Sequence, residues 1–383
     1  MKKVGVVTIS RDFVLLNYGT FFQHYALRHF MESHGLKTCR CPDEDELNVS
    51  ALWIWEFVVK VILRVLVRLF RGVDYHVVKG LKSAMISIVR RYRFLREYTN
   101  LLGRFSDRDN CVCDFYVIGS DQVWTNSSAH YYVVNEDSER PRIAYAASAD
   151  WKHSMGNDKW RMLISAELPK FIGVSCREKF GCELVSRLSG IDVFHAIDPV
   201  FLLSCDDFLS LASKERAFRR QTLLCYLVNL HDGDGDIPRE MVKLAEELKI
   251  AVQFVALQGA ERVVSFSSQS IPSPSQFLSY VRDAKYVVTN SFHGVALSLI
   301  FGKCFCYLEQ CERNGASQNI RAKELLESVN MSDIILSWNA THDDMQHVLT
   351  RQLNYDFAHE AIAQWRERSR SWLAKKILIA SGE

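Results

Sequence analysis

Several features that would narrow the function are missing from this chain of 383 residues. The formal net charge is only +2, so no global electrostatic field favours nucleic acid as a partner. The histidines are scattered and do not form the clusters that are typical of metal sites. The sequence shows no internal repeat, low-complexity tract or transmembrane span. We therefore expect a globular protein with no metal and no nucleic-acid partner.

The first ten residues, MKKVGVVTIS, lack the long apolar core and the cleavage site of a signal peptide. The 11 cysteines are an odd number in a long chain, so we expect reduced thiols in a cytoplasmic protein. Zinc sites usually place about two to four residues between paired cysteines. Three pairs here have one intervening residue, and we interpret them as small hydrophobic residues in or near strands: Cys39/Cys41, Cys111/Cys113 and Cys304/Cys306.

Length and composition predict two globular domains. Hydrophobic residues make up 48% of the chain and charged residues 24%, which is typical of soluble proteins. A chain of this length exceeds one ordinary core. The polar run that begins at Ser213 separates two series of strands. We place an N-terminal domain at 1–205 and a C-terminal domain, with a terminal helix, at 206–383.

Strand and helix patterns alternate in both halves. Residues 2–9 predict a buried strand, a helix pattern follows Asn17, and 36–41 predict the next strand. Further strand patterns that precede turns or helices are DFYVI, RIAYAAS, FIGVSC, VFHAID, TLLCYLVNL, AVQFVAL and YVVT. Such alternation predicts α/β architecture with two parallel sheets, that is, two Rossmann-like domains facing one cleft.

Residues 51–105 predict a helical insertion in the first domain. Within 53–71 the charged residues recur every four positions, which makes one polar stripe on an apolar helix: Glu56, Lys60, Arg64 and Arg68. One interpretation is an interfacial helix that contacts the cytoplasmic membrane at its inner face. The other is a helical hairpin packed on the body of the protein, which is the commoner use of such a pattern.

Two strand ends carry polar side chains suited to chemistry. After the strand Tyr286–Val288 come Asn290, Ser291, His293 and Gly294, and then an apolar helix pattern. A histidine at the carboxyl end of a strand and the N-terminus of a helix lies where α/β proteins bind anions. This position favours catalysis or ligand binding over a purely structural histidine.

A second strand, DFYVI, ends in Gly119, Ser120 and Asp121. Asp121 is expected either to bind acceptor hydroxyls or to cap a helix. In the first loop, Asn17 and Gly19 either shape a substrate site or make a tight turn.

These motifs together resemble the polysaccharide pyruvyl transferase family. The resemblance covers about residues 3–330 and rests on motifs in a specific order: Asn17-Tyr18-Gly19 with Gln23, VIGSDQVW, AYAAS, VSCREK, Asp198-Pro199 and TNSFHGVALSLIFGK. It implies a glycosyltransferase-B-like pair of domains. It also implies transfer of a pyruvyl group from phosphoenolpyruvate to two sugar hydroxyls as a cyclic ketal. The expected acceptor is a precursor of a cell-surface polysaccharide (capsule or exopolysaccharide), lipid-linked or not.

The resemblance also assigns residues. His293 is expected to be catalytic, and Arg177 and Arg313 to bind phosphoenolpyruvate, since an arginine can bond bidentately to phosphate or carboxylate. The expected substrate-binding positions are Asn17, Gly19, Ser120, Asp121, Asn290, Ser291 and Gly294. No cofactor is expected beyond the donor substrate.

Two other functions stay open. One is a glycosyltransferase that uses a nucleotide sugar on the same architecture. The other is a membrane-docked assembly protein whose enzyme-like halves are inactive. The three functions differ in the donor that is consumed: phosphoenolpyruvate, a nucleotide sugar, or neither.

Overall fold

The structure is a computed structural model. It describes residues 1–9, 17–41, 93–94, 96–97, 99–102, 112–125, 129, 133, 139–230, 236–257, 269–311 and 319–382. Most of the predicted insertion at 51–105, including the polar stripe in 53–71, lies outside the described residues, and so does Arg313.

Six parallel strands form the first sheet, in the order β2-β1-β3-β4-β5-β6. They are β1 (Lys3–Val7), β2 (Lys37–Arg40), β3 (Phe115–Ile118), β4 (Arg142–Ala147), β5 (Gly173–Cys176) and β6 (Val193–His195). The three strands β3, β4 and β5 are buried along their whole length, because separate clusters of core residues cover the two faces of the sheet. Strands covered on both faces need such nearly continuous apolar sequence.

Short polar residues and one glycine set the ends of several helices around this sheet. The Asn17 side chain accepts hydrogen bonds at the start of α1, and that of Asn157 does so at the start of α6, while Gly190 ends α7 with a φ of 70°. The helices of this half are α1 (Tyr18–Ser33), α5 (Trp151–Met155), α6 (Asp158–Glu167), α7 (Lys179–Ser189) and α8 (Cys205–Leu211), with 3₁₀ helices η3 (Leu168–Lys170) and η4 (Pro199–Leu202).

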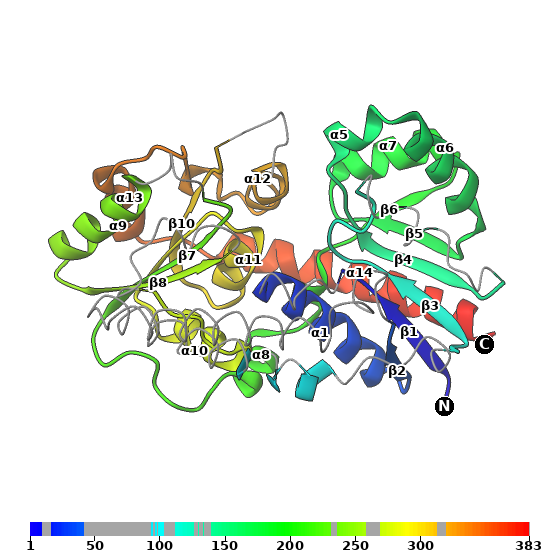
Figure 1. The fold of residues 1–383 in the computed structure, drawn as a ribbon, viewed down its shortest axis with the longest axis horizontal. Coiled ribbons are helices and arrows are strands. Elements are labelled where there is room, and N and C mark those ends of the chain that lie inside the picture. Colours follow the sequence, from blue (N-terminus) through cyan, green and yellow to red (C-terminus); the bar gives the residue numbers. More distant parts are fainter. Residues whose placement is uncertain are drawn as a thin grey trace, which may run out of the picture.

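Five parallel strands form the second sheet, in the order β11-β10-β9-β7-β8. They are β7 (Thr222–Val228), β8 (Ala251–Leu257), β9 (Tyr286–Thr289), β10 (Cys304–Leu308) and β11 (Ile335–Leu336). The helices of this half are α9 (Asp236–Glu247), α10 (Pro274–Asp283), α11 (Phe292–Ile300), α12 (Asn319–Ser328) and α13 (His342–Thr350), with the 3₁₀ helix η8 (Ser332–Ile334). Figure 1 shows the two sheets side by side, and the predicted pair of parallel-sheet α/β domains is confirmed.

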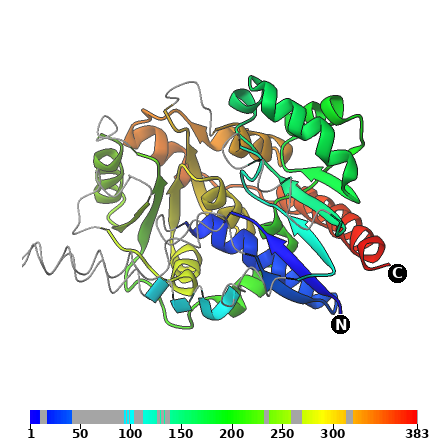
Figure 2. The ribbon, with the colours of Figure 1, turned by 45° about the vertical axis from the view of Figure 1, so that its right-hand side comes forward.

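The terminal helix α14 (Asp356–Ser381) returns to the first domain (Figure 1, Figure 2). Its Ser369 hydroxyl accepts a hydrogen bond from the Ile197 N–H at 3.0 Å, and Lys376 donates to the Ile172 carbonyl at 3.0 Å. The described contacts of α14 therefore include the first sheet, although the sequence division placed this helix with the second domain. Chain position alone could not show this return.

One continuous apolar core joins the two domains. Tyr18 of α1 stacks on Phe277 of α10 with ring centroids 4.1 Å apart, and its hydroxyl donates to the Pro272 carbonyl at 2.5 Å. Tyr18 and Trp124 are both fully buried. Both rings therefore belong to the packed core of the protein.

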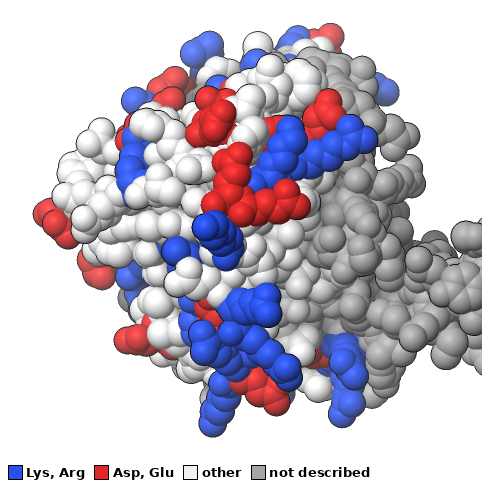
Figure 3. Space-filling view, turned by 90° about the vertical axis from the view of Figure 1, so that its left-hand side faces the viewer, with Lys and Arg blue, Asp and Glu red and all other residues white. Residues whose placement is uncertain are grey.

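The outer face of the second domain carries charges of both signs. Figure 3 shows acidic and basic side chains near one another on this face. Pairs on α9 contribute to this mixture, with Lys243 2.6 Å from Glu240 and Arg239 3.1 Å from Asp236. None of the described helices is long and apolar enough to cross a bilayer.

His24 on α1 is a buried histidine of the first domain. It is 1% exposed, and neither ring nitrogen has a hydrogen-bond partner among the described residues. Burial, and then the positive charges of Arg40 and Arg28, hold its pKa well below the usual range. His24 is therefore neutral in the folded protein near pH 7.

We expect His24→Phe to flatten the pH dependence of stability below neutrality. In the unfolded chain the pKa of His24 is about 6.5, so the side chain binds a proton as the pH falls below that value. In the folded chain the buried side chain stays neutral. Stability from His24 is thus present above that pH and lost as the pH falls. Urea unfolding at pH 7 and pH 5 measures the difference. His29→Phe, an exposed position on the same helix, should keep the wild-type difference. Equal differences in wild type and His24→Phe would contradict the prediction.

Candidate active site

His293 is the second residue of α11, immediately beyond the end of β9. Its side chain is buried, and its Nε2 atom has no hydrogen-bond partner among the described residues. The nearest opposite charge is the Asp198 carboxylate, with 3.8 Å between Nε2 and Oδ2. A buried, unpartnered ring nitrogen beside a carboxylate is available to a ligand or a proton.

The surroundings of His293 favour its neutral form. Burial lowers the pKa of the imidazole from its usual value, and Arg177 and Arg321 act in the same direction. The carboxylates of Asp198 and Asp121 oppose them but do not outweigh burial. The imidazole is therefore neutral near pH 7, and a bound anion beside it would favour its protonated form.

Two glycines allow the close packing around His293. A Cβ atom on Gly19 would lie 2.0 Å from His293 Nδ1, and one on Gly294 would lie 2.2 Å from Thr289 Oγ1. Gly19 thus lets the start of α1 meet the imidazole from the other domain. Gly294 lets α11 approach the end of β9. Both glycines were predicted to lie at the site. Because they have no side chain, they let the neighbouring groups approach closely.

Arg177 follows β5 and forms a buried ion pair with Asp198 near the end of β6. Its NH1 atom is 2.7 Å from Asp198 Oδ2, and its Nε atom is 3.0 Å from Glu178 Oε1. Burial alone would lower the pKa of Arg177, but Glu178, Asp198 and Asp121 together raise it. The guanidinium lies over the Phe292 ring, 4.6 Å from its centroid. Its NH2 atom has no hydrogen-bond partner among the described residues.

Asp121 and Ser120 lie beside this ion pair. A cis peptide bond joins Gly119 to Ser120, and the Ser120 hydroxyl donates to the Ala146 carbonyl at 3.0 Å. Asp121 accepts a hydrogen bond from the Thr20 hydroxyl at 3.2 Å. Burial raises the pKa of its carboxyl group, but nearby positive groups, Arg177 first, outweigh this and lower it. Helix capping, the other role predicted for Asp121, is not among these contacts.

Three further charged residues complete the site, and sequence reasoning had not selected them. Asp198, interpreted as a strand end, contacts Arg177 and lies near His293. Glu178 holds Arg177 and accepts a hydrogen bond from the Trp151 indole at 2.9 Å. On α12, Arg321 NH1 is 3.8 Å from Asp121 Oδ1. The Asp-Pro motif was a usable signal for Asp198, whereas nothing local distinguishes Arg321 from a surface arginine.

The remaining predicted residues support the loops. Asn17 Oδ1 accepts from the Gly19 and Thr20 backbone N–H groups at 2.9 and 3.4 Å. The Asn290 side chain accepts from the Val228 N–H at 2.8 Å and donates to the Val228 carbonyl at 2.7 Å. The backbone N–H of Ser291 donates to the Thr289 hydroxyl at 3.1 Å. These contacts position the strand ends on which the charged residues sit.

A cavity of about 400 Å³ lies next to Arg177. Its lining comes from both domains and includes Glu178 and Asp198 from the first, and Phe292, Arg321 and Glu324 from the second. His293 is not part of the lining, but the Arg177–Asp198 pair connects it to the cavity. The volume lies in the usual range for small-molecule sites, about 300–1,000 Å³.

The two Rossmann-like domains define a GT-B-like fold. Solved structures share this fold. A UDP-N-acetylglucosamine 2-epimerase from Rickettsia bellii matches with a TM-score of 0.54 at 10% identity, covering 99% of this chain and 96% of that one. The UDP-GlcNAc 2-epimerase of Methanocaldococcus jannaschii, in complex with UDP-GlcNAc and UDP, matches with a TM-score of 0.50 at 11% identity, covering 94% and 99%.

The family is shown by sequence. The family model for polysaccharide pyruvyl transferase matches residues 17–311, and the chain therefore belongs to this family. The resemblance inferred from the motifs is confirmed. No curated protein matches the chain.

We expect Gly19→Ala to disturb the site because the added methyl group overlaps the imidazole of His293. Overpacking of this kind costs about 1–3 kcal/mol unless the ring moves. Chemical unfolding and the NMR signals of the His293 ring measure the two effects. Gly156→Ala is the control. Its added Cβ would lie 3.6 Å from the His153 carbonyl oxygen, which is an ordinary contact, and its φ of −74° suits alanine. If Gly19→Ala changed neither stability nor the ring signals, this packing account would be wrong.

Proposed function

We propose that the chain transfers the pyruvyl group of phosphoenolpyruvate to a sugar of a cell-surface polysaccharide or lipid-linked precursor, as a cyclic ketal. The observation that carries the proposal is a pair of buried nitrogen atoms beside Asp198. Arg177 NH2 and His293 Nε2 both lack a hydrogen-bond partner among the described residues. Buried polar groups are nearly always satisfied, so these two are suited to a ligand.

The reaction needs two proton transfers. Two sugar oxygens bond to C2 of phosphoenolpyruvate, and the bond from C2 to the phosphate oxygen breaks. Of the two hydroxyl protons, one converts the methylene group to a methyl group, and the other leaves with inorganic phosphate. A histidine that is neutral at the start can accept a hydroxyl proton and return it as an acid.

Within this scheme His293 is the general acid and base. Arg177 and Arg321 bind the donor, which carries a phosphate and a carboxylate. The buried guanidinium group of Arg177 and the partly exposed one of Arg321 match those two anions. Asp198 positions Arg177 and balances its charge. Ser120 and Asp121 are assigned to the acceptor hydroxyls. Donor binding by Arg313 stays a prediction, and so does membrane contact through 53–71.

The alternative donor is a nucleotide sugar. The fold shared with the epimerases does not decide between donors, because identity near 10% shows the fold alone. The third alternative is an assembly protein that consumes no donor. The same assay separates these outcomes.

We expect acceptor-dependent release of phosphate from phosphoenolpyruvate. The acceptor panel contains galactose, glucose and N-acetylmannosamine units, free and lipid-linked. His293→Ala should lower the rate by about 10²–10⁴-fold, the usual share of a general acid or base. Arg177→Lys should raise the KM for the donor, since lysine lacks the planar fork. His34→Ala, an exposed position, should leave the rate unchanged.

The proposal fails if no acceptor gives phosphate release and calorimetry detects no phosphoenolpyruvate binding. Consumption of a nucleotide sugar in that case would establish the glycosyltransferase. Consumption of neither donor would support the assembly protein.

The pH dependence of kcat/KM should move in opposite directions in two variants. Asp121 raises the pKa of His293, so Asp121→Asn should shift the acidic limb to lower pH. Arg321 lowers that pKa, so Arg321→Gln should shift the same limb to higher pH. Both changes should reduce the rate, but the position of the limb is a separate readout. Shifts in the same direction would show that His293 does not control this limb.

A further inference from the structure

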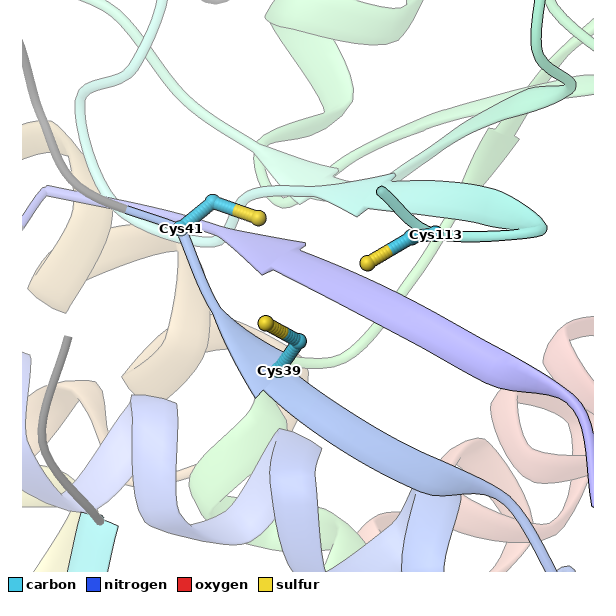
Figure 4. A group of neighbouring side chains, drawn as sticks. All are labelled: Cys39, Cys41 and Cys113. Carbon is cyan, nitrogen blue, oxygen red and sulfur yellow. The ribbon is translucent and has the colours of Figure 1, made fainter. Parts of the chain in front are cut away.

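Three cysteine side chains meet in the first domain, outside the lining of the cavity. Cys39 lies on β2, Cys41 follows β2, and Cys113 precedes β3. Their sulfur atoms all lie within 4.8 Å of one another, and all three residues are buried. Figure 4 shows the three side chains directed toward a common space across β1. Cys39 and Cys113 are 74 positions apart in the sequence, so their meeting is a product of the fold.

The space that they share depends on Gly5 of β1. Gly5 pairs with Cys39 on one side and with Tyr116 on the other, because β1 lies between β2 and β3. A Cβ atom on Gly5 would lie 2.9 Å from the Cys41 sulfur and 2.4 Å from the Tyr116 ring. The absence of a side chain at this central strand position lets sulfur from two different segments converge above the backbone.

The spacing of the sulfur atoms suits a tetrahedral metal ion. Zinc binds thiolate sulfur at about 2.3 Å, which places two sulfur ligands of a tetrahedron roughly 3.8 Å apart. The sulfur atoms lie within 4.8 Å of one another, which is close to that spacing. Thiolate ligands favour zinc over magnesium or calcium.

We propose that Cys39, Cys41 and Cys113 bind a Zn²⁺ ion when the chain is reduced. Cys41 is disulfide-bonded in this structure, so the expectation that all the cysteines are reduced does not hold for it. A dithiol reductant would supply the two electrons that return Cys41 to a thiol. Binding then releases the thiol protons, and zinc takes their place. Cys111 is the nearest further cysteine in the sequence, and its position lies outside the described residues.

Zinc binding requires all three sulfur atoms to be thiolates. Three thiolates could not share this space without a cation, because their charges would repel in a dry environment. Small hydrophobic packing, the interpretation from sequence alone, does not by itself require the sulfur atoms to meet.

The ion would join two places far apart along the chain. Cys41 and Cys113 stand at the two ends of residues 42–112, and Cys39 anchors the site on β2. Zinc at this point would therefore stabilise the first sheet where that long segment leaves and returns. None of the three cysteines lines the cavity beside Arg177, so the role is structural.

The first test measures metal content. The full chain is produced with zinc in the medium, purified with a phosphine reductant and no chelator, and analysed by inductively coupled plasma mass spectrometry. We expect about one zinc per chain in the wild type and a loss of most of it in Cys39→Ser and Cys113→Ser. Cys225→Ser is the matched control, since Cys225 is a buried thiol on the second sheet, and it should keep the zinc.

A second measurement uses the wild type alone, in case the serine variants do not fold. The reduced protein is stripped with a chelator and titrated with Co²⁺. We expect the near-ultraviolet absorption of cobalt bound to thiolates, and a thermal midpoint that falls by several degrees without metal. Absence of zinc and of the cobalt–thiolate band in the reduced wild type would overturn the proposal. Zinc retained equally in Cys39→Ser, Cys113→Ser and Cys225→Ser would also overturn it.

Discussion

The buried ion pair between Arg177 and Asp198 is the interaction on which the site depends. The two residues follow the neighbouring parallel strands β5 and β6, so the sheet itself brings them to one edge. Removing one partner of such a pair leaves a buried charge uncompensated and costs about 3–5 kcal/mol. The same carboxylate lies 3.8 Å from His293 of the second sheet. One acidic group thus links Arg177 of one domain to His293 of the other.

Close packing between the domains maintains that link. Gly19 allows the start of α1 to touch His293, and Tyr18 next to it packs into the second domain. From the opposite end of the chain, α14 returns to the first sheet and bonds to the backbone near Asp198. The position of His293 relative to Arg177 is consequently fixed by several contacts rather than by one loop.

Burial and opposing charges set the protonation states of Arg177 and His293. Carboxylates of Asp121, Glu178 and Asp198 keep Arg177 charged despite burial. Burial keeps His293 neutral. Two nitrogen atoms then remain unpartnered among the described residues, and a phosphate or carboxylate oxygen would satisfy them. The zinc ion proposed for Cys39, Cys41 and Cys113 would serve a different need, the stability of the first sheet.

The sequence by itself determined what local periodicity and local capping encode. Alternation predicted the parallel sheets. Polar residues after strands predicted Ser120 and Asp121 at the carboxyl edge of one sheet and His293 at the carboxyl edge of the other. Tertiary structure decided which distant groups meet: Asp198 with His293, and Arg321 with Asp121. Such pairs depend on strand order and on the packing of two domains, and no spacing along the chain encodes either.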